Sequence, residues 1–123
     1  MKHCILIKYL PSVTGREALE PAIRTRFDGL VRGPEAVRGV HGVDVIANTV
    51  DRGNRFDLLI RIDMERDALS AYDESPIHRR WKVEYGPLLE KKAIFDYEKE
   101  QTAPCFPPVD IPLSVRYDLD QIL

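Results

Sequence analysis

The spacing of apolar positions predicts the first strand and the first helix. Residues 2–10 (KHCILIKYL) are rich in β-branched and aromatic types and stop at a proline, which is typical of a central strand. Apolar residues then recur at three- and four-residue spacing and indicate a helix with one buried stripe: Leu19, Ile23, Phe27, Leu30 and Val31. Thr14 and Glu17 match a capping box, but Pro21 suits only a first turn, so we expect the regular helix to begin near residue 19 or 20.

The middle of the chain predicts a β-hairpin. After a Gly-Pro break, residues 34–40 are either a short helical turn or an irregular connection. Residues 42–50 (GVDVIANTV) then read as extended. The turn signal DRGN at residues 51–54 separates them from residues 55–63 (RFDLLIRID), in which apolar and more polar positions alternate as in a half-buried strand.

Two further helices and one strand complete the order of elements. We expect a short helix over residues 67–72, a helix from residue 76 to about 85, and a strand over residues 93–98. The sequence strand, helix, strand, strand, helix, strand is that of the ferredoxin-like split βαβ arrangement, an α+β class with helices on one face of an antiparallel sheet. In a single subunit, the face of the sheet that the helices do not cover would expose apolar side chains to water. We therefore expect two sheets to pair in a homodimer, a dimeric α/β barrel.

The C-terminal region differs in composition. Four of the nine prolines lie there, and they are Pro104, Pro107, Pro108 and Pro112. We therefore divide the chain into one domain, residues 1–100, and a proline-rich C-terminal arm, residues 101–123. The arm either packs on its own subunit, crosses to the partner or is disordered.

Charge and cysteine content narrow the function classes. The 18 basic and 20 acidic residues are interspersed, which disfavours partners such as nucleic acid or a membrane surface. Apolar runs are shorter than a membrane span and no secretory signal is evident, so a cytoplasmic location is expected. Cys4 and Cys105 form no CxxC pair and are interpreted as plain thiols. The three histidines are scattered and lack the neighbouring carboxylates or thiolates of a metal site, so no metal is expected.

The stretch AYDESPIHRRW, residues 71–81, holds the candidate chemistry. On one continuous helix, Tyr72 and His78 would lie about 240° apart around the axis. Pro76 disfavours helical geometry at Ser75 and suits the start of a new helix with Ser75 as its N-cap. The two segments can therefore turn independently, and the two side chains need not face different ways. A first-turn histidine is favoured in its neutral form, which accepts a proton. In the architectural alternative both rings only cap or pack.

Four segments carry a family resemblance: KHCILIKY, RFDLLIRI, AYDESPIH and IFDYE, which together span residues 2–98. A Tyr-x3-Pro-x-His step followed by a terminal Phe-Asp-Tyr strand is their most specific feature. In this order they resemble the stress-responsive α/β-barrel family, the dimeric Dabb domains. The resemblance implies a dimer of ferredoxin-like subunits, each enclosing a small, mostly apolar cavity between its sheet and its helices.

The resemblance also suggests roles for the Tyr72 and His78 pair. In a plant cyclase of this family, a tyrosine and a histidine at these places close a ring in a linear polyketide thioester without a metal or organic cofactor. We therefore hypothesise that His78 is a general base and that the Tyr72 hydroxyl donates to the developing oxyanion. Asp96 shares a strand face with Ile94, so it either orients the His78 imidazole or bonds neighbouring backbone.

Further residues are candidates for the cavity wall. His3 matches a cavity histidine of the cyclase, although a polar residue at a frayed strand end explains it equally well. Leu58, or Asp57 after a one-residue shift, falls where the cyclase has a second histidine. The candidate lining set is completed by Ile5, Ile7, Trp81 and Ile94, of which Trp81 is either pocket wall or core.

Two departures from the cyclase bear on the substrate. Lys82 and Glu84 on the later helix and Lys92 on the last strand replace small or apolar residues of the cyclase, which disfavours a long alkyl-chain substrate.

Two hypotheses on function, from different classes, remain. The first is a cofactor-free cyclase- or lyase-like enzyme on a small carbonyl compound, and the second is a non-catalytic dimeric domain that binds a small apolar ligand or another protein. A cofactor-free monooxygenase is a weaker third.

Overall fold

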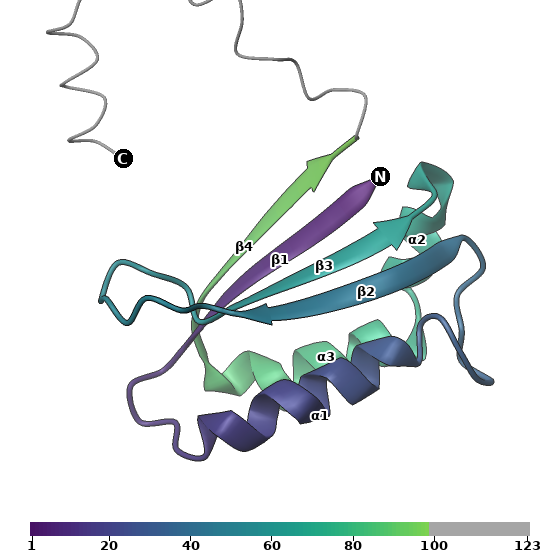
Figure 1. Ribbon diagram of the computed structural model, residues 1–123. Coiled ribbons are helices and arrows are strands. Elements are labelled where there is room, and N and C mark those ends of the chain that lie inside the picture. The colour runs from purple at the N-terminus through teal and green to yellow at the C-terminus, as the bar shows by residue number, and fades with distance from the viewer. Residues whose placement is uncertain (99–123) are drawn as a thin grey trace, which may run out of the picture.

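The computed structural model describes residues 1–98, which form a four-stranded sheet and helices on one of its faces (Figure 1). All strand pairs are antiparallel, and the strand order across the sheet is β2-β3-β1-β4. The strands are β1 (Lys2–Tyr9), β2 (Val40–Ala47), β3 (Leu58–Met64) and β4 (Leu89–Tyr97). The predicted 101–123 arm lies outside the described residues.

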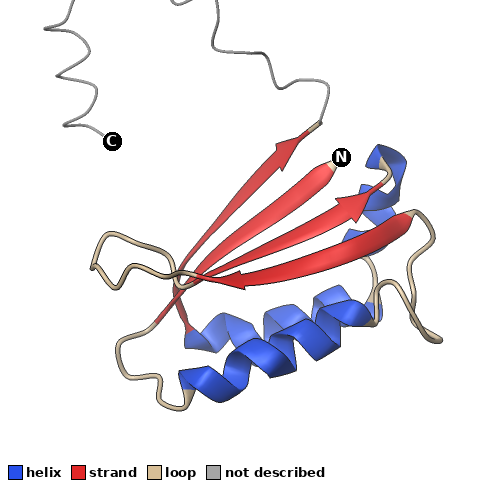
Figure 2. Cartoon of the chain, viewed as in Figure 1, coloured by secondary structure: helices blue, strands red, loops and turns tan. Residues whose placement is uncertain are grey.

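The helices occupy one layer. They are α1 (Arg16–Asp28), the short η1 (Arg66–Ala68) and α2 (Leu69–Asp73), α3 (Pro76–Tyr85) and the turn η2 (Gly86–Leu88). Figures 1 and 2 show α1 and α3 side by side beneath the sheet, with α2 near the start of β1. This order and layering confirm the predicted ferredoxin-like α+β fold. No helix of the described residues is long and apolar enough to cross a membrane.

The core lies between the sheet and these helices. Alternate residues of β3 are buried and face the helices, as the period-2 pattern requires: Leu58, Ile60, Ile62 and Met64. From the helix layer, Phe27 of α1 and Trp81 of α3 meet edge to face with ring centroids 5.0 Å apart. Such large buried rings contribute most of the hydrophobic stabilisation of a domain of this size.

The predicted start of the first helix is wrong. The helix begins at Arg16, behind an N-cap at Gly15 with φ 68°, and no side chain caps it. Thr14 and Glu17 therefore form no capping box. Pro21 lies inside the helix, where it removes one backbone hydrogen bond. Burial of Ile23 and Phe27 against the sheet outweighs that loss.

The hairpin of β2 and β3 is confirmed, but its strand ends are shifted from the predicted ones. β2 begins at Val40 and ends at Ala47, and β3 begins only at Leu58. Directly before β3, Asp57 bonds both neighbouring segments, because its N–H donates to the Ile7 carbonyl at 2.7 Å and its carbonyl accepts from the Asn48 N–H at 2.9 Å. The last strand begins at Leu89 rather than residue 93, directly after the turn η2.

The other face of the sheet carries no helix, as Figure 2 shows. Side chains on this face include Leu6 and Leu59, which are cross-strand partners, and Phe95, the partner of Cys4 on the edge strand. Phe95 is 64% exposed and Ile46 is 44% exposed. The sheet therefore presents an uncovered surface with large apolar side chains, the feature from which a homodimer was expected.

Candidate active site

A break between α2 and α3 brings Tyr72 and His78 together. α2 ends at Asp73 and α3 begins at Pro76, with Ser75 in extended geometry as its N-cap. The Ser75 hydroxyl donates to the Tyr72 carbonyl at 2.7 Å and accepts from the His78 N–H at 3.2 Å. The Tyr72 and His78 ring centroids lie 4.7 Å apart. The predicted break and N-cap are confirmed, and they place both rings at one point.

His78 is held as a neutral base. Its Nδ1 lies 2.9 Å from the backbone carbonyl of Asp73, and because a carbonyl only accepts, Nδ1 carries the proton. Nε2 then keeps its lone pair. Burial lowers the pKa of His78, and Lys82 and Lys92 lower it further, whereas the carbonyl and charge of Asp73 act in the opposite direction. The ring therefore offers Nε2 as a proton acceptor at neutral pH.

Tyr72 supplies a buried donor. Its side chain is fully buried, and within residues 1–98 its hydroxyl has no hydrogen-bond partner. Burial raises the pKa of Tyr72, and the charges of Asp73 and Asp96 raise it further, so the hydroxyl stays protonated. A buried polar group without a partner is costly, and such groups often mark a place for a ligand or water. The Tyr72 hydroxyl is thus a buried donor that residues 1–98 leave unpaired.

His3 and Asp96 form a second pair beside Tyr72. They are cross-strand partners on β1 and β4, and His3 Nδ1 lies 2.5 Å from Asp96 Oδ1. The buried His3 ring meets Tyr72 edge-on at 5.3 Å. The hypothesis that Asp96 orients His78 is therefore wrong, because the strand register places the Asp96 carboxylate opposite His3, whose ring it contacts. His3 also pairs with Ile62 on its other side, so it does not lie at a frayed strand end.

The remaining predicted lining residues lie at other places. Ile5, Ile7 and Trp81 are buried in the packed core between the sheet and the helices. Leu58 also belongs to this core, but it pairs with Ile7, several residues along the sheet from His3. Ile94 is 49% exposed, although its cross-strand partner Ile5 faces the helices. The helix layer therefore leaves this part of β4 uncovered.

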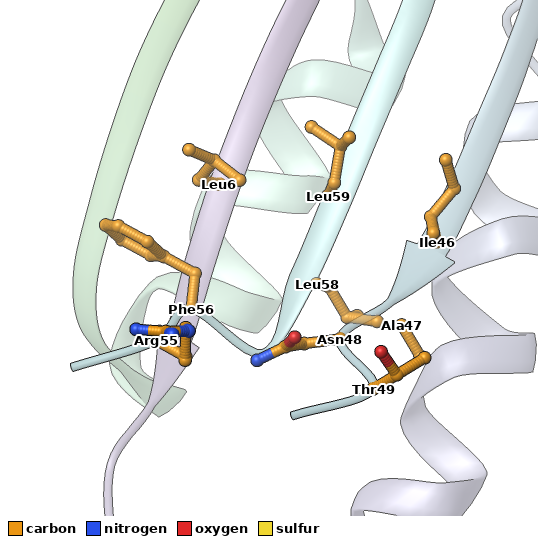
Figure 3. A pocket seen from close by; sticks show the side chains of 9 residues that line it. All are labelled: Leu6, Ile46, Ala47, Asn48, Thr49, Arg55, Phe56, Leu58 and Leu59. Atoms are coloured by element: carbon orange, nitrogen blue, oxygen red, sulfur yellow. The ribbon is translucent and has the colours of Figure 1, made fainter. Parts of the chain in front are cut away.

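A hollow of about 390 Å³ lies on the opposite, helix-free face (Figure 3). Figure 3 shows Leu6, Leu59 and Ile46 on three neighbouring strands, with Phe56 beside them. Leu58 is the one predicted lining residue among the side chains of this hollow. Tyr72 and His78 lie on the helix side of the sheet. These two residues, with the neighbouring His3 and Asp96, are called the Tyr72 site, and it is separate from the hollow.

Some features of the site leave no sequence signal. The carbonyl of Asp73 fixes the His78 tautomer, and every residue has such a carbonyl, so only the folded geometry identifies it. The clustering of Lys82 and Lys92 near His78 depends on where β4 lies, which the predicted strand start did not give. In the described part of the chain, no group of three or more histidine, cysteine, aspartate or glutamate side chains is placed to hold a metal ion.

Comparison with solved structures identifies the fold. The sequence matches no family model and no curated protein. A dimeric protein of unknown function and ferredoxin-like fold from Bacteroides fragilis is 20% identical, with a TM-score of 0.63, and the match covers 79% of this chain and 93% of that one. A Dabb family protein with a ferredoxin-like fold from Mesorhizobium loti is 15% identical, with a TM-score of 0.58 and the same two coverages, 79% and 93%.

An enzyme has the same architecture. The hydroxynitrile lyase from Passiflora edulis is 14% identical, with a TM-score of 0.63, and the match covers 84% of this chain and 95% of the lyase. At these identities the likeness concerns the fold and not the reaction. The chain has the ferredoxin-like fold that solved dimeric proteins, a Dabb family protein and a hydroxynitrile lyase share.

Proposed function

We propose that the protein is a member of the Dabb family and a cofactor-free acid–base enzyme that acts on a small carbonyl compound. One observation carries this proposal: the neutral His78 ring lies 4.7 Å from the ring of Tyr72, whose buried hydroxyl has no hydrogen-bond partner within residues 1–98. A base with a free lone pair beside an unpaired donor is the minimum set for forming an enolate.

The proposed step uses only side chains of this chain. His78 Nε2 removes a proton from the carbon next to the substrate carbonyl, so a C–H bond breaks and an N–H bond forms. The electron pair moves to the carbonyl oxygen, which becomes negative and accepts a hydrogen bond from the Tyr72 hydroxyl. His78 then returns its proton to a carbon or to a leaving group. The His3–Asp96 pair positions the Tyr72 ring from its other side.

The similar structures support this proposal in two respects. The sequence segments that resemble Dabb domains fall on β1, β3, the α2–α3 break and β4, the elements that build the site. The Passiflora edulis protein is a lyase, which indicates that this fold can carry lyase chemistry. Neither likeness names a substrate.

The proposed assembly is a homodimer through the helix-free sheet face. The structural neighbours from Bacteroides fragilis and Thermobifida fusca are dimeric proteins with this fold. Pairing two such faces would cover Phe95 and the hollow of Figure 3 in both subunits, and a stable interface buries about 800 Å² per partner. A dimer would enclose that hollow, which favours small-ligand binding there as a second candidate function.

Native mass spectrometry tests the assembly and the second candidate together. The wild-type chain is expected to be a dimer, Phe95→Glu a monomer, and Val83→Glu a dimer, because Val83 is equally apolar and 74% exposed but lies on α3. A small molecule that co-purifies with the dimer and is lost from Phe95→Glu would support binding in the hollow. A monomeric wild type would contradict the assembly.

Proton exchange tests the chemistry. Deuterium incorporation next to the carbonyl of phenylacetone and of phenylpyruvate is followed by NMR in D₂O. We expect the wild type to accelerate exchange of at least one ketone, and His78→Gln to lose about 10²–10⁴-fold of that acceleration. His41→Gln is the matched control, since His41 is an exposed histidine that bonds Glu65 on the sheet rim. Equal rates in the wild type and His78→Gln would end the proposal.

A further inference from the structure

Two lysines that form no ion pair within residues 1–98, Lys82 and Lys92, lie near His78. Lys82 follows His78 by one helical turn, so both lie on the same side of α3. Lys92 lies on the uncovered strand β4. In residues 1–98 neither lysine side chain takes part in an ion pair or hydrogen bond, whereas Glu84 is paired with Arg26 and Asp96 with His3.

The sheet register directs Lys92 toward the site. Lys92 is the cross-strand partner of Ile7, and directly opposed residues of an antiparallel pair project to the same face. Ile7 is buried beneath the helices, so Lys92 projects to the α3 side together with Ile94. A hollow of about 250 Å³ borders Lys92 at the C-terminal end of α3; it is lined by Gly86, Leu89, Glu90, Lys91 and Lys92, and not by His78 or Tyr72.

Lys82 and Lys92 are the cations that act on His78, and the charge of Asp73 acts on it in the opposite direction. Both lower the pKa of His78, so both lie close enough to act on its ring. The acidic groups nearby have other partners or act from elsewhere. Asp96 is bound to His3, Glu90 lies 3.8 Å from Lys8, and Asp73 acts from the α2 side of His78.

We propose that the substrate of this site is anionic: a small carbonyl compound that also carries a carboxylate, which Lys82 and Lys92 bind while its carbonyl lies at Tyr72 and His78. This inference rests on the proposed acid–base function and names its substrate class. Two cations on a short stretch of rim attract a carboxylate, whereas the apolar Ile94 between Lys92 and Asp96 accommodates the remainder of a small molecule.

The same charges serve the chemistry. A carboxylate bound by the lysines offsets the part of the field on His78 that comes from Lys82 and Lys92, so the base becomes stronger when the correct substrate is present. A neutral analogue would leave that field in place. The lysines thereby select the substrate both by binding and by the basicity of His78.

Ligand titration tests the inference without relying on turnover. The ring signals of His78, assigned by their loss in His78→Gln, are followed by NMR during addition of benzoate and, separately, of its neutral analogue benzamide. We expect benzoate to bind roughly fivefold or more tightly than benzamide, as two partly exposed ion pairs allow, and raised salt to reduce the difference.

Matched variants locate the selectivity. The double variant Lys82→Gln/Lys92→Gln is expected to bind benzoate and benzamide alike. Lys2→Gln is the control and keeps the wild-type preference, because Lys2 is paired with Asp63, its cross-strand partner, and projects to the helix-free face. Equal binding of the two probes by the wild type, no response of His78 to either, or a preference that survives the double variant would each overturn the inference.

Failure of the inference and failure of the proposed function give different results. Benzoate selectivity that depends on Lys82 and Lys92, in a protein that accelerates no proton exchange, would keep the anion site and remove the catalytic proposal. Acceleration of exchange in phenylacetone, with benzoate and benzamide bound alike, would keep the catalytic proposal and remove the anion site.

Discussion

Tyr72 of α2 and Tyr9 of β1 are both buried in the core between the sheet and the helices, but at different places. In residues 1–98 neither hydroxyl has a hydrogen-bond partner, and burial raises the pKa of both, that of Tyr9 to about 12. Tyr9 lies against the Arg16 guanidinium at 5.4 Å from its ring centroid, and its N–H is bound by Asp57. Tyr72 lies between the imidazoles of His78 and His3.

The difference shows that an unpaired buried hydroxyl does not define a site by itself. Arg16 is permanently charged, and Tyr9 has no imidazole in contact with it among the described residues. The Tyr72 region differs because the His78 ring lies 4.7 Å from the Tyr72 ring and, with Nδ1 bound to the Asp73 carbonyl, keeps the lone pair of Nε2. We therefore interpret the Tyr9 region as structural and the Tyr72 region as catalytic.

The largest effect on stability is expected from Ser75→Ala, which removes hydrogen bonds in the Tyr72 region and leaves the Tyr9 region unchanged. Ser75 is buried, and its hydroxyl both donates to Tyr72 and accepts from His78, so its loss should reduce the free energy of unfolding by about 2 kcal/mol, at the upper end for an N-cap. Urea unfolding measures this. Ser70→Ala, at an exposed serine of α2, should change stability by less than about 0.5 kcal/mol. A loss equal to that of Ser70→Ala would contradict the role of Ser75.

The two tyrosines themselves sharpen the comparison. Tyr72→Phe and Tyr9→Phe each remove a hydroxyl that bonds nothing in the described chain, so each should leave the free energy of unfolding unchanged or raise it by about 1 kcal/mol. The same urea experiment measures both. A loss above about 2 kcal/mol in either variant would show that its hydroxyl has a partner in solution, such as a bound water.

The smallest expected effect is on how the free energy of unfolding changes with pH. The folded pKa of His78 lies below its unfolded value near 6.5, so protonation favours the unfolded chain, and His78 should lower stability as pH falls from above 6.5 toward the folded pKa. The groups facing His78 are Tyr72, Asp73, Lys82 and Lys92. Urea unfolding of His78→Gln between pH 7.5 and 5.5 should therefore show a weaker loss than the wild type. An equal loss in both would contradict a lowered pKa.

The sequence predicted the fold and the central pair because both depend on local rules. Period-2 alternation in β3 and the Ser75–Pro76 step each act over a few residues, and both are observed. The start of α1 was mispredicted because its stability comes from tertiary burial of Phe27, which overrides the local cost of Pro21.

The partner of Asp96 was mispredicted for a different reason. Sequence alternation gave the face of β4 on which Asp96 lies, but not its register against β1. The register pairs Asp96 with His3, and only the assembled sheet contains that information. The position of Lys92 near His78 depends on the same register.

Exchange catalysis by the two phenylalanine variants tests the central claim most directly. Deuterium exchange of phenylpyruvate and phenylacetone is measured for the wild type, Tyr72→Phe and Tyr9→Phe at equal protein concentration and pH. If the Tyr72 region is catalytic and the Tyr9 region structural, Tyr72→Phe loses roughly 10–10³-fold of the catalysed rate for the better ketone, and Tyr9→Phe keeps the wild-type rate. Equal rates in both variants would contradict the assignment of the site to Tyr72 and His78.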